Sequence, residues 1–150
     1  MRLYQVVFFA AVCAVAAAAA DPFVGSWKLD VAKSKLGSQW DLQDLRRTDE
    51  LVGPNTHRLV EVSTGRDGQQ HRTEYTSILD GKEHSLSDGT VTTDKRIDEH
   101  HIKGIAQKNG HSRTIEAEVS ADGKTLTLHI TGAGFSTGTP IDRTEVFDRQ

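Results

Sequence analysis

Cysteine is nearly absent from this sequence of 150 residues, which contains only Cys13. Because Cys13 lies in an apolar N-terminal segment, residues 21–150 contain no thiol at all. A cysteine nucleophile, a cysteine-ligated metal and a disulfide framework are therefore excluded for that part of the chain. Its stability has to come from hydrogen bonds and from the modest apolar core that one domain of this size can bury.

Aromatic residues are also scarce, at 6% of the sequence. Those that follow residue 20 are Phe23, Trp27, Trp40, Tyr75, Phe135 and Phe147. A filled β-sandwich core usually needs more bulk than this, whereas a small barrel with a partly open interior needs less.

Long basic runs are missing as well. No run of Lys and Arg exceeds two residues, and the formal net charge is −3. Nucleic-acid binding needs a concentrated basic face, so the sequence predicts no nucleic-acid partner.

The first 20 residues have the pattern of a signal peptide. Arg2 supplies the positive charge, residues 6–15 form an apolar run, and small residues end at Ala20. The run is short for a membrane span. We therefore expect cleavage near Ala20, export to the periplasm or outside the cell, and no stable membrane insertion afterwards.

Lipid attachment at Cys13 is an alternative to cleavage near Ala20. It is disfavoured because Val12, the residue before the cysteine, is not small. Residues 21–150 contain no linker and no repeat beyond a regular spacing of turns, so we expect them to form one domain.

Turn dipeptides are frequent in residues 21–150. They are Asp67-Gly68, Asp80-Gly81, Asp88-Gly89, Asn109-Gly110 and Asp122-Gly123. Such pairs favour tight hairpin turns, because their central positions take positive φ angles. With short alternating segments between them, they predict an all-β antiparallel up-and-down barrel of eight to ten strands.

The alternation of apolar and polar residues assigns faces to the predicted strands. We place two polar groups inside, Arg58 and Tyr75, where a buried Arg58 would need a carboxylate from a ligand or from an internal Asp or Glu. The predicted ligand-binding residues are Arg58, Tyr75, Leu79, Ile115, Ala117, Leu126 and Leu128.

The segment Gly25-Ser26-Trp27 resembles the motif that opens the first strand of the calycins, which include lipocalins, fatty-acid-binding proteins and avidins. The resemblance implies that Trp27 plugs one end of the barrel. It also implies a basic residue over the indole ring, a role that Arg143 or Arg149 can fill through a cation–π contact.

A longer resemblance covers most of residues 21–150 and relates them to small exported bacterial proteins of lipocalin-like type. It carries no activity with it. Its main stretches are Trp27-Lys28-Leu29-Asp30, Glu74-Tyr75-Thr76, Lys95-Arg96-Ile97-Asp98 and Val146-Phe147-Asp148-Arg149-Gln150. Asp94 stands where those proteins usually have an apolar residue, which leaves the inward register of residues 90–97 open.

No catalytic or metal-binding residues are predicted. Of the seven histidines, His100 and His101 are adjacent in a predicted strand and point to opposite faces. No HExxH motif is present, and haem held by one inward histidine, as in the lipocalin-like nitrobindins, is a less favoured alternative. The segment Gly134-Phe135-Ser136-Thr137-Gly138 has the spacing of a nucleophile elbow, but no helix follows it, so we interpret it as a flexible loop.

The sequence thus favours a non-catalytic, exported, lipocalin-like barrel that binds a small hydrophobic or amphipathic ligand without a cofactor. One alternative is an interaction module whose barrel is filled and holds no ligand. Another is an enzyme on a calycin-type barrel. Trp40 fits either a lid at one barrel end or the core beneath the first connection, and the oligomeric state is left open.

Overall fold

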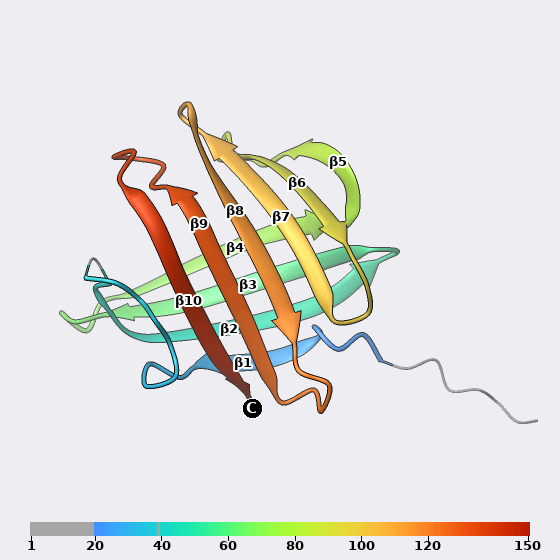
Figure 1. The fold of residues 1–150 in the computed structure, drawn as a ribbon, viewed down its shortest axis with the longest axis horizontal. Coiled ribbons are helices and arrows are strands. Elements are labelled where there is room, and N and C mark those ends of the chain that lie inside the picture. Colours follow the sequence, from blue (N-terminus) through green and yellow to red (C-terminus); the bar gives the residue numbers. More distant parts are fainter. Residues whose placement is uncertain (1–19, 39) are drawn as a thin grey trace, which may run out of the picture.

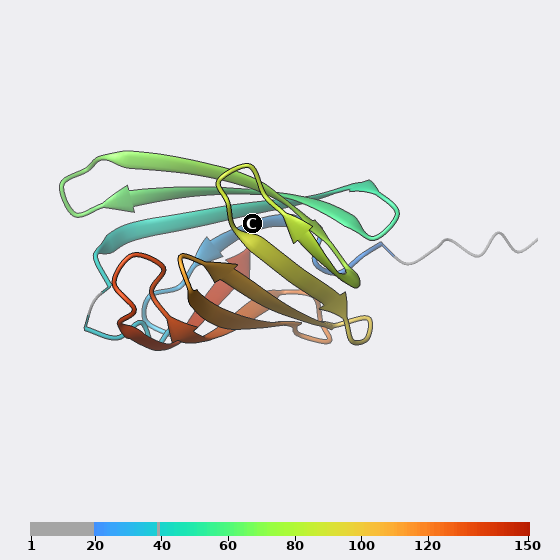
Figure 2. The same ribbon diagram turned by 90° about the horizontal axis from the view of Figure 1, so that it is seen from above.

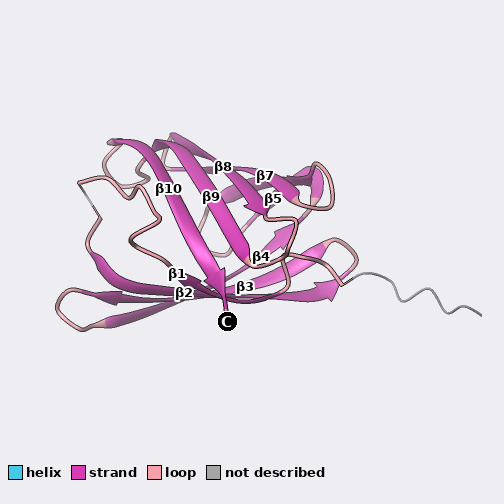
Figure 3. Cartoon of the chain, turned by 60° about the horizontal axis from the view of Figure 1, so that its bottom comes forward, coloured by secondary structure: helices cyan, strands magenta, loops and turns pink. Residues whose placement is uncertain are grey.

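The computed structural model describes residues 20–38 and 40–150, so the predicted signal peptide, apart from Ala20, lies outside the described residues. This part of the chain consists of strands and loops (Figure 3). It accordingly contains no helix with the length and apolar character that a membrane crossing requires.

Ten strands follow one another along the described chain, which confirms the predicted fold class. Their bounds are β1 (Gly25–Leu29), β2 (Leu42–Gly53), β3 (Thr56–Gly65), β4 (Gln70–Ile78), β5 (Asp80–Ser85), β6 (Val91–Arg96), β7 (His101–Lys108), β8 (His111–Val119), β9 (Thr125–Ala133) and β10 (Pro140–Arg149).

The strands form one antiparallel sheet in the order β4-β3-β2-β1-β10-β9-β8-β7-β6-β5. Figure 1 shows β2–β4 crossing behind β7–β10 at a steep angle, and Figure 2 shows the same two groups as facing layers. The sheet thereby curls into a nearly closed barrel, which hides most of its edges.

One pair of consecutive strands does not hydrogen-bond. β4 and β5 are neighbours in sequence, yet they lie at opposite ends of the strand order. The Asp80-Gly81 dipeptide, predicted as a hairpin turn, lies inside β5, where Gly81 has a φ of 73° and the pairing with β6 is irregular. The chain therefore changes layer here, and a seam runs between β4 and β5.

The two ends of the barrel differ. The turns β5–β6, β7–β8 and β9–β10 gather at one end, seen at the top of Figure 1, which we call the open end. The other end is covered by residues 21–24 and by the β8–β9 turn, and we call it the closed end.

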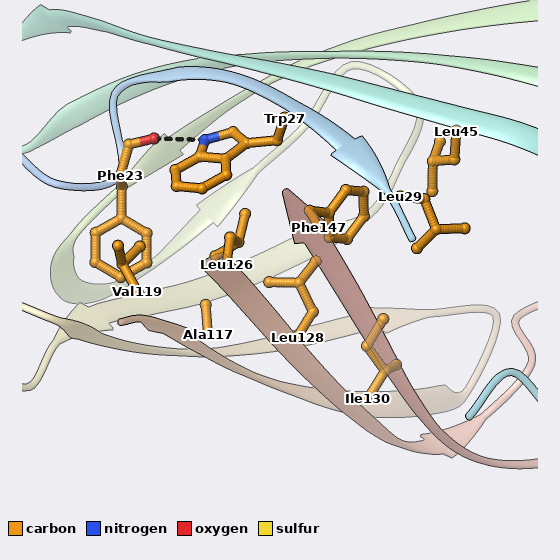
Figure 4. Packing of buried hydrophobic residues seen from close by; sticks show 10 residues of the cluster. All are labelled: Phe23, Trp27, Leu29, Leu45, Ala117, Val119, Leu126, Leu128, Ile130 and Phe147. Atoms are coloured by element: carbon orange, nitrogen blue, oxygen red, sulfur yellow. Dashed lines mark hydrogen bonds between the residues drawn. The ribbon is translucent and has the colours of Figure 1, made fainter. Parts of the chain in front are cut away.

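The apolar core lies toward the closed end. β1, β8, β9 and β10 contribute most of it, because alternate residues of these strands point inward (Figure 4). Its buried members are Phe23, Trp27, Leu29, Leu45, Ala117, Val119, Leu126, Leu128, Ile130 and Phe147. Toward the open end, the inward positions of the described strands include the charged Arg113 and Arg143.

Candidate functional site

Trp27 and Arg149 meet at the closed end. Trp27 is 1% exposed, and its indole Nε1 donates to the carbonyl oxygen of Phe23 over 3.0 Å. The guanidinium carbon of Arg149 lies 4.1 Å from the centre of the indole ring. Arg143 does not share this role, because it lies over the ring of Trp40 at 5.4 Å.

Arg149 also ties the N-terminal segment to the barrel. Its guanidinium donates to the carbonyl oxygens of Pro22, Val24 and Gly123 at 2.5, 2.8 and 2.5 Å. A cation that serves three carbonyl groups in this way fixes the position of residues 21–24, which are thereby part of the closed end.

A second polar cluster links the N-terminal segment to both layers. The Asp21 carboxylate lies 2.5 Å from Arg96 Nη2 on β6 and 3.4 Å from His57 Nε2 on β3. His57 is 1% exposed, and its Nδ1 lies 2.7 Å from Asp49 Oδ1 on β2. Asp21 therefore bridges the two layers close to the seam.

Side-chain hydrogen bonds cross the seam itself, and one of them joins β4 directly to β6. Ser77 on β4 donates to Asp94 Oδ2 on β6 over 2.6 Å. Burial raises the pKa of Asp94, although the Ser77 hydroxyl opposes that effect. The register that the sequence left open is thus resolved, since Asp94 pairs with Gly104 and points inward.

The interior of the barrel also holds an ion pair and a tyrosine from the β2–β4 layer. Arg47 Nη1 lies 3.2 Å from Glu61 Oε1, and the Tyr75 hydroxyl lies 3.5 Å from the same oxygen. Burial raises the pKa of Tyr75. The Nε of Arg47 is buried without a hydrogen-bond partner in the described structure.

The opposite layer supplies a second ion pair. Arg143 Nε lies 2.6 Å from Glu145 Oε1, and Glu145 is 3% exposed. Burial raises the pKa of Glu145, and the charge of Arg143 works against this effect. The charge of Glu61 also raises the pKa of Glu145 and that of Arg47 lowers it, so the two ion pairs are close enough to influence one another.

Arg113 on β8 is the third guanidinium of this interior. It pairs with Gly132 of β9, on the same face as Ile115 and the buried Ala117. No carboxylate lies within ion-pair distance of it among the described residues, and its buried Nε has no partner. Burial, followed by the charge of Arg143, lowers the pKa of Arg113.

We define the mouth cluster as Arg47, Glu61, Tyr75, Arg113, Arg143 and Glu145. It contains three cations and two carboxylates. An anion bound at Arg113 would therefore lie in a cluster with a net positive charge. Because the cluster is partly buried, charge-assisted hydrogen bonds there are stronger than in bulk water. The apolar wall of Ile115, Leu128 and Ile130 lies beside the cluster, since Arg143 pairs with Ile130 and Glu145 with Leu128.

Two hollows adjoin the open end. One, of about 230 Å³, lies beside Trp40 and Arg143, under the connection between β1 and β2. The other, of about 450 Å³, lies over the β7–β8 turn and is lined by Gly89, Val91 and residues 107–112. Trp40 packs against the core and donates from Nε1 to Leu42 O over 3.0 Å.

The predicted inward position of Arg58 was wrong. Arg58 lies on the outer face of β3, where it pairs with Glu50 at 3.1 Å and with Glu74 at 2.6 Å. Leu59, its neighbour, points inward and is 3% exposed. Since side chains alternate along a strand, an inward Leu59 requires an outward Arg58.

The other predicted ligand-binding residues lie inside the barrel, but in different places. Tyr75 belongs to the mouth cluster, whereas Ala117, Leu126 and Leu128 lie in the core. Ile115 packs against the core from the side of the mouth cluster. Leu79 is buried at the β4–β5 connection, outside the main core.

Sequence reasoning missed four members of the mouth cluster as candidate site residues. The alternation along the strands could have identified them, because residues two positions apart point to the same face. Each charged residue is two positions from a buried apolar residue: Arg47 from Leu45, Glu61 from Leu59, and Glu145 from Phe147. A charged residue at an inward position of a strand is unusual and marks a polar interior. Arg113 follows the same rule with respect to Ile115 and Ala117.

The described ranges, 20–38 and 40–150, contain no group of three or more His, Cys, Asp or Glu side chains placed to hold a metal ion.

Comparison with known proteins supports the fold. No protein-family model matches this chain, and no curated protein sequence matches it. Among solved structures it resembles a Schistosoma mansoni fatty-acid-binding protein in complex with arachidonic acid. The TM-score is 0.61 at 16% identity, covering 86% of this chain and 96% of that one. The chain therefore has a fatty-acid-binding-protein-like fold.

The fluorescent protein UnaG has a similar structure. In its wild-type form the TM-score is 0.59 at 12% identity, covering 85% of this chain and 97% of that one. Identities this low establish a shared architecture and leave function to be argued from the site.

Proposed function

We propose that this protein is a non-catalytic carrier that binds a small amphipathic acid inside the barrel. The apolar part of the ligand would lie against Ile115, Leu128 and Ile130, and its anionic group would bind Arg113. The observation that carries the proposal is the Arg113 guanidinium, which is half-buried, unpaired with any described carboxylate, and left with an unpartnered Nε.

The ion pairs of the mouth cluster leave Arg113 as the favoured position for a single bound anion. Arg47 is engaged by Glu61 and Arg143 by Glu145, so both of these guanidiniums already have a carboxylate. A ligand carboxylate at Arg113 would balance the remaining cation. The same carboxylate nearer Glu61 or Glu145 would meet like charge, which fixes the orientation of the ligand.

The similar solved structures support this choice over catalysis. One is a fatty-acid-binding protein in complex with arachidonic acid, and its fold matches over nearly its whole length. The described residues of our chain provide an apolar wall and a charged mouth, which are the two components that an amphipathic ligand needs.

Titration of a dansyl-labelled undecanoic acid and of its methyl ester tests the proposal. We expect saturable binding of the acid, which should weaken about tenfold or more in Arg113→Met, because a hydrogen bond to a charged group is lost. The ester should bind both proteins equally. Arg58→Met removes an exposed arginine of β3 and should change neither titration.

A second variant separates the interior from the outer surface. Ala117 is 8% exposed on the inner face of β8. Ala117→Trp would place a large ring against the apolar wall and should abolish binding of both probes. If the unaltered protein bound neither probe, the carrier function would be wrong, and a filled interaction module would be the better description.

We also propose that the carrier acts outside the cytoplasm after removal of residues 1–20. The support comes from the order of Arg2, the apolar residues 6–15 and the small residues that end at Ala20. Mass spectrometry of the protein recovered from periplasmic and culture fractions tests this proposal, with Asp21 expected as the first residue. A mass that retained residues 1–20 would contradict it.

A further inference from the structure

The loop between β9 and β10 places an aromatic ring over the unpaired arginine. The guanidinium carbon of Arg113 lies 3.7 Å from the centre of the Phe135 ring. This separation is that of two planar groups in van der Waals contact, so one face of the guanidinium is covered. The loop is the glycine-bounded segment of residues 134–138.

Two glycines, one near the end of β9 and one in the loop, allow close packing against β8. Gly132 has a φ of 124°, and a Cβ there would lie 2.7 Å from the Cα of Arg113. Gly138 has a φ of 69°, and a Cβ there would lie 2.8 Å from Cε1 of His111. Only glycine permits both approaches, and they bring the loop down onto the start of β8.

The loop is bonded mainly to itself. Gly138 N donates to Gly134 O over 2.8 Å, and Gly134 N donates to Thr139 O over 2.9 Å. A side-chain hydrogen bond reaches it from the neighbouring β7–β8 turn, where Asn109 Nδ2 donates to Phe135 O over 3.3 Å. The hydrogen bonds within the loop thus fix its shape, and Phe135 contacts Arg113 from this loop at the open end.

We propose that Phe135 is a positioning residue of the anion site, an inference that rests on the proposed function. The ring covers one face of Arg113 and excludes water from it, while the N–H groups in the guanidinium plane stay free for a ligand carboxylate. A carboxylate binds a guanidinium edge-on, so the stacked ring orients Arg113 without competing for the anion.

The first experiment needs no ligand. Phenylglyoxal reacts with accessible guanidiniums, and peptide mapping reports the modification of Arg113 separately from that of other arginines. We expect Phe135→Ala to raise the modification rate of Arg113 at least about threefold. Phe135→Tyr should restore the slow rate, and Arg58 in the same samples serves as an exposed internal control.

The second experiment uses the dansyl acid and its methyl ester. Phe135→Ala should weaken binding of the acid by about threefold to tenfold and leave the ester unchanged, because only the acid uses the oriented guanidinium. Phe135→Leu keeps an apolar cover without a ring and should resemble the alanine variant. Equal losses for acid and ester would instead indicate a general effect on the barrel and overturn the positioning role.

The two experiments separate this inference from the carrier function. If the unaltered protein bound neither probe, the carrier proposal would fail, and the modification rate of Arg113 would still test the stacking contact. If Phe135→Ala left that rate unchanged in a protein with an unaltered unfolding midpoint, Phe135 would not shield Arg113 and the inference would be wrong.

Discussion

Ser77 and Asp94 join two strands that share no backbone hydrogen bond. Ser77 on β4 donates to Asp94 on β6 over 2.6 Å, across the seam between β4 and β5. Both side chains point inward, and Ser77 is 7% exposed. The stability of the seam therefore depends on side chains, whereas the other strand boundaries have hydrogen-bonded ladders.

We expect Ser77→Ala to lower the free energy of unfolding by about 1–3 kcal/mol, because it leaves a buried carboxylate without its donor. Ser112→Ala, at an exposed position on β8, should change it by less than about 0.5 kcal/mol. Denaturant unfolding of the three proteins measures both values. Equal midpoints for the two variants would show that the seam bond contributes nothing to stability.

Asp94→Asn should change how stability depends on pH. Burial raises the pKa of Asp94, so the folded protein binds this proton more tightly than the unfolded chain does. This tighter binding of the proton stabilises the folded protein at pH values below the ordinary carboxyl pKa. The stabilisation is lost as the pH rises through the raised pKa of Asp94. The parent should therefore lose more stability than Asp94→Asn over that range, and parallel curves would contradict the assignment.

Trp27→Ala should lower the free energy of unfolding by about 3–5 kcal/mol, since it removes a large buried ring. Arg149→Met keeps the aliphatic stem and loses the hydrogen bonds to three carbonyl groups. We expect it to lower the free energy of unfolding by about 1.5–3 kcal/mol. Arg58→Met is the control for loss of an arginine. A Trp27→Ala protein that unfolded at the parental denaturant concentration would rule out the plug.

Gly132→Ala should destabilise the protein by more than about 2 kcal/mol, because a φ of 124° is unfavourable for alanine and the added carbon meets the backbone at Arg113. Gly110→Ala is the matched control, as Gly110 has a φ of 77° and open space around it. Gly110→Ala should lower the free energy of unfolding by about 1 kcal/mol. Similar losses in the two variants would mean that the close approach at Gly132 is unimportant.

The pKa of His101 should lie above the ordinary value of a histidine. Its hydrogen bond to Asp98, at 2.8 Å, raises the pKa of His101, and the bond lowers the pKa of Asp98 in turn. In Asp98→Asn the histidine pKa should fall. Nuclear magnetic resonance titration of the imidazole Cε1–H in both proteins measures the change, and an unchanged pKa would show that the pair does not form in solution.

Turns and alternation were enough to predict the fold. Asn109-Gly110 connects two paired strands with φ angles of 53° and 77°, as the dipeptide predicts. Asp80-Gly81 has the same composition and yet lies inside β5. A dipeptide reports local backbone geometry, whereas a seam depends on which strands the whole barrel brings together.

The interior was harder to predict than the fold. Alternation shows that Arg58 and Val60 share a face, but it does not say whether that face is the inner one. In β3 the outer face carries the valines, and the inner face carries His57, Leu59 and Glu61. Inside this barrel, charged side chains form ion pairs with one another, so polar residues occupy inward positions of β3. The expectation that the apolar face of a strand points inward therefore assigned the faces of β3 the wrong way round.

The strand order also has a consequence for how the chain folds. Every ladder joins strands that are consecutive in sequence except that of β1 with β10, where Trp27 pairs with Arg149. That contact closes the longest loop, so we expect its formation to carry most of the loop-closure entropy and to come late. Ser26 O also accepts from Gln150 N over 2.9 Å, so a short linker can join the segment before β1 to Gln150. A circular permutant cut at the β4–β5 seam would break no ladder and would turn the slowest pairing into a local hairpin.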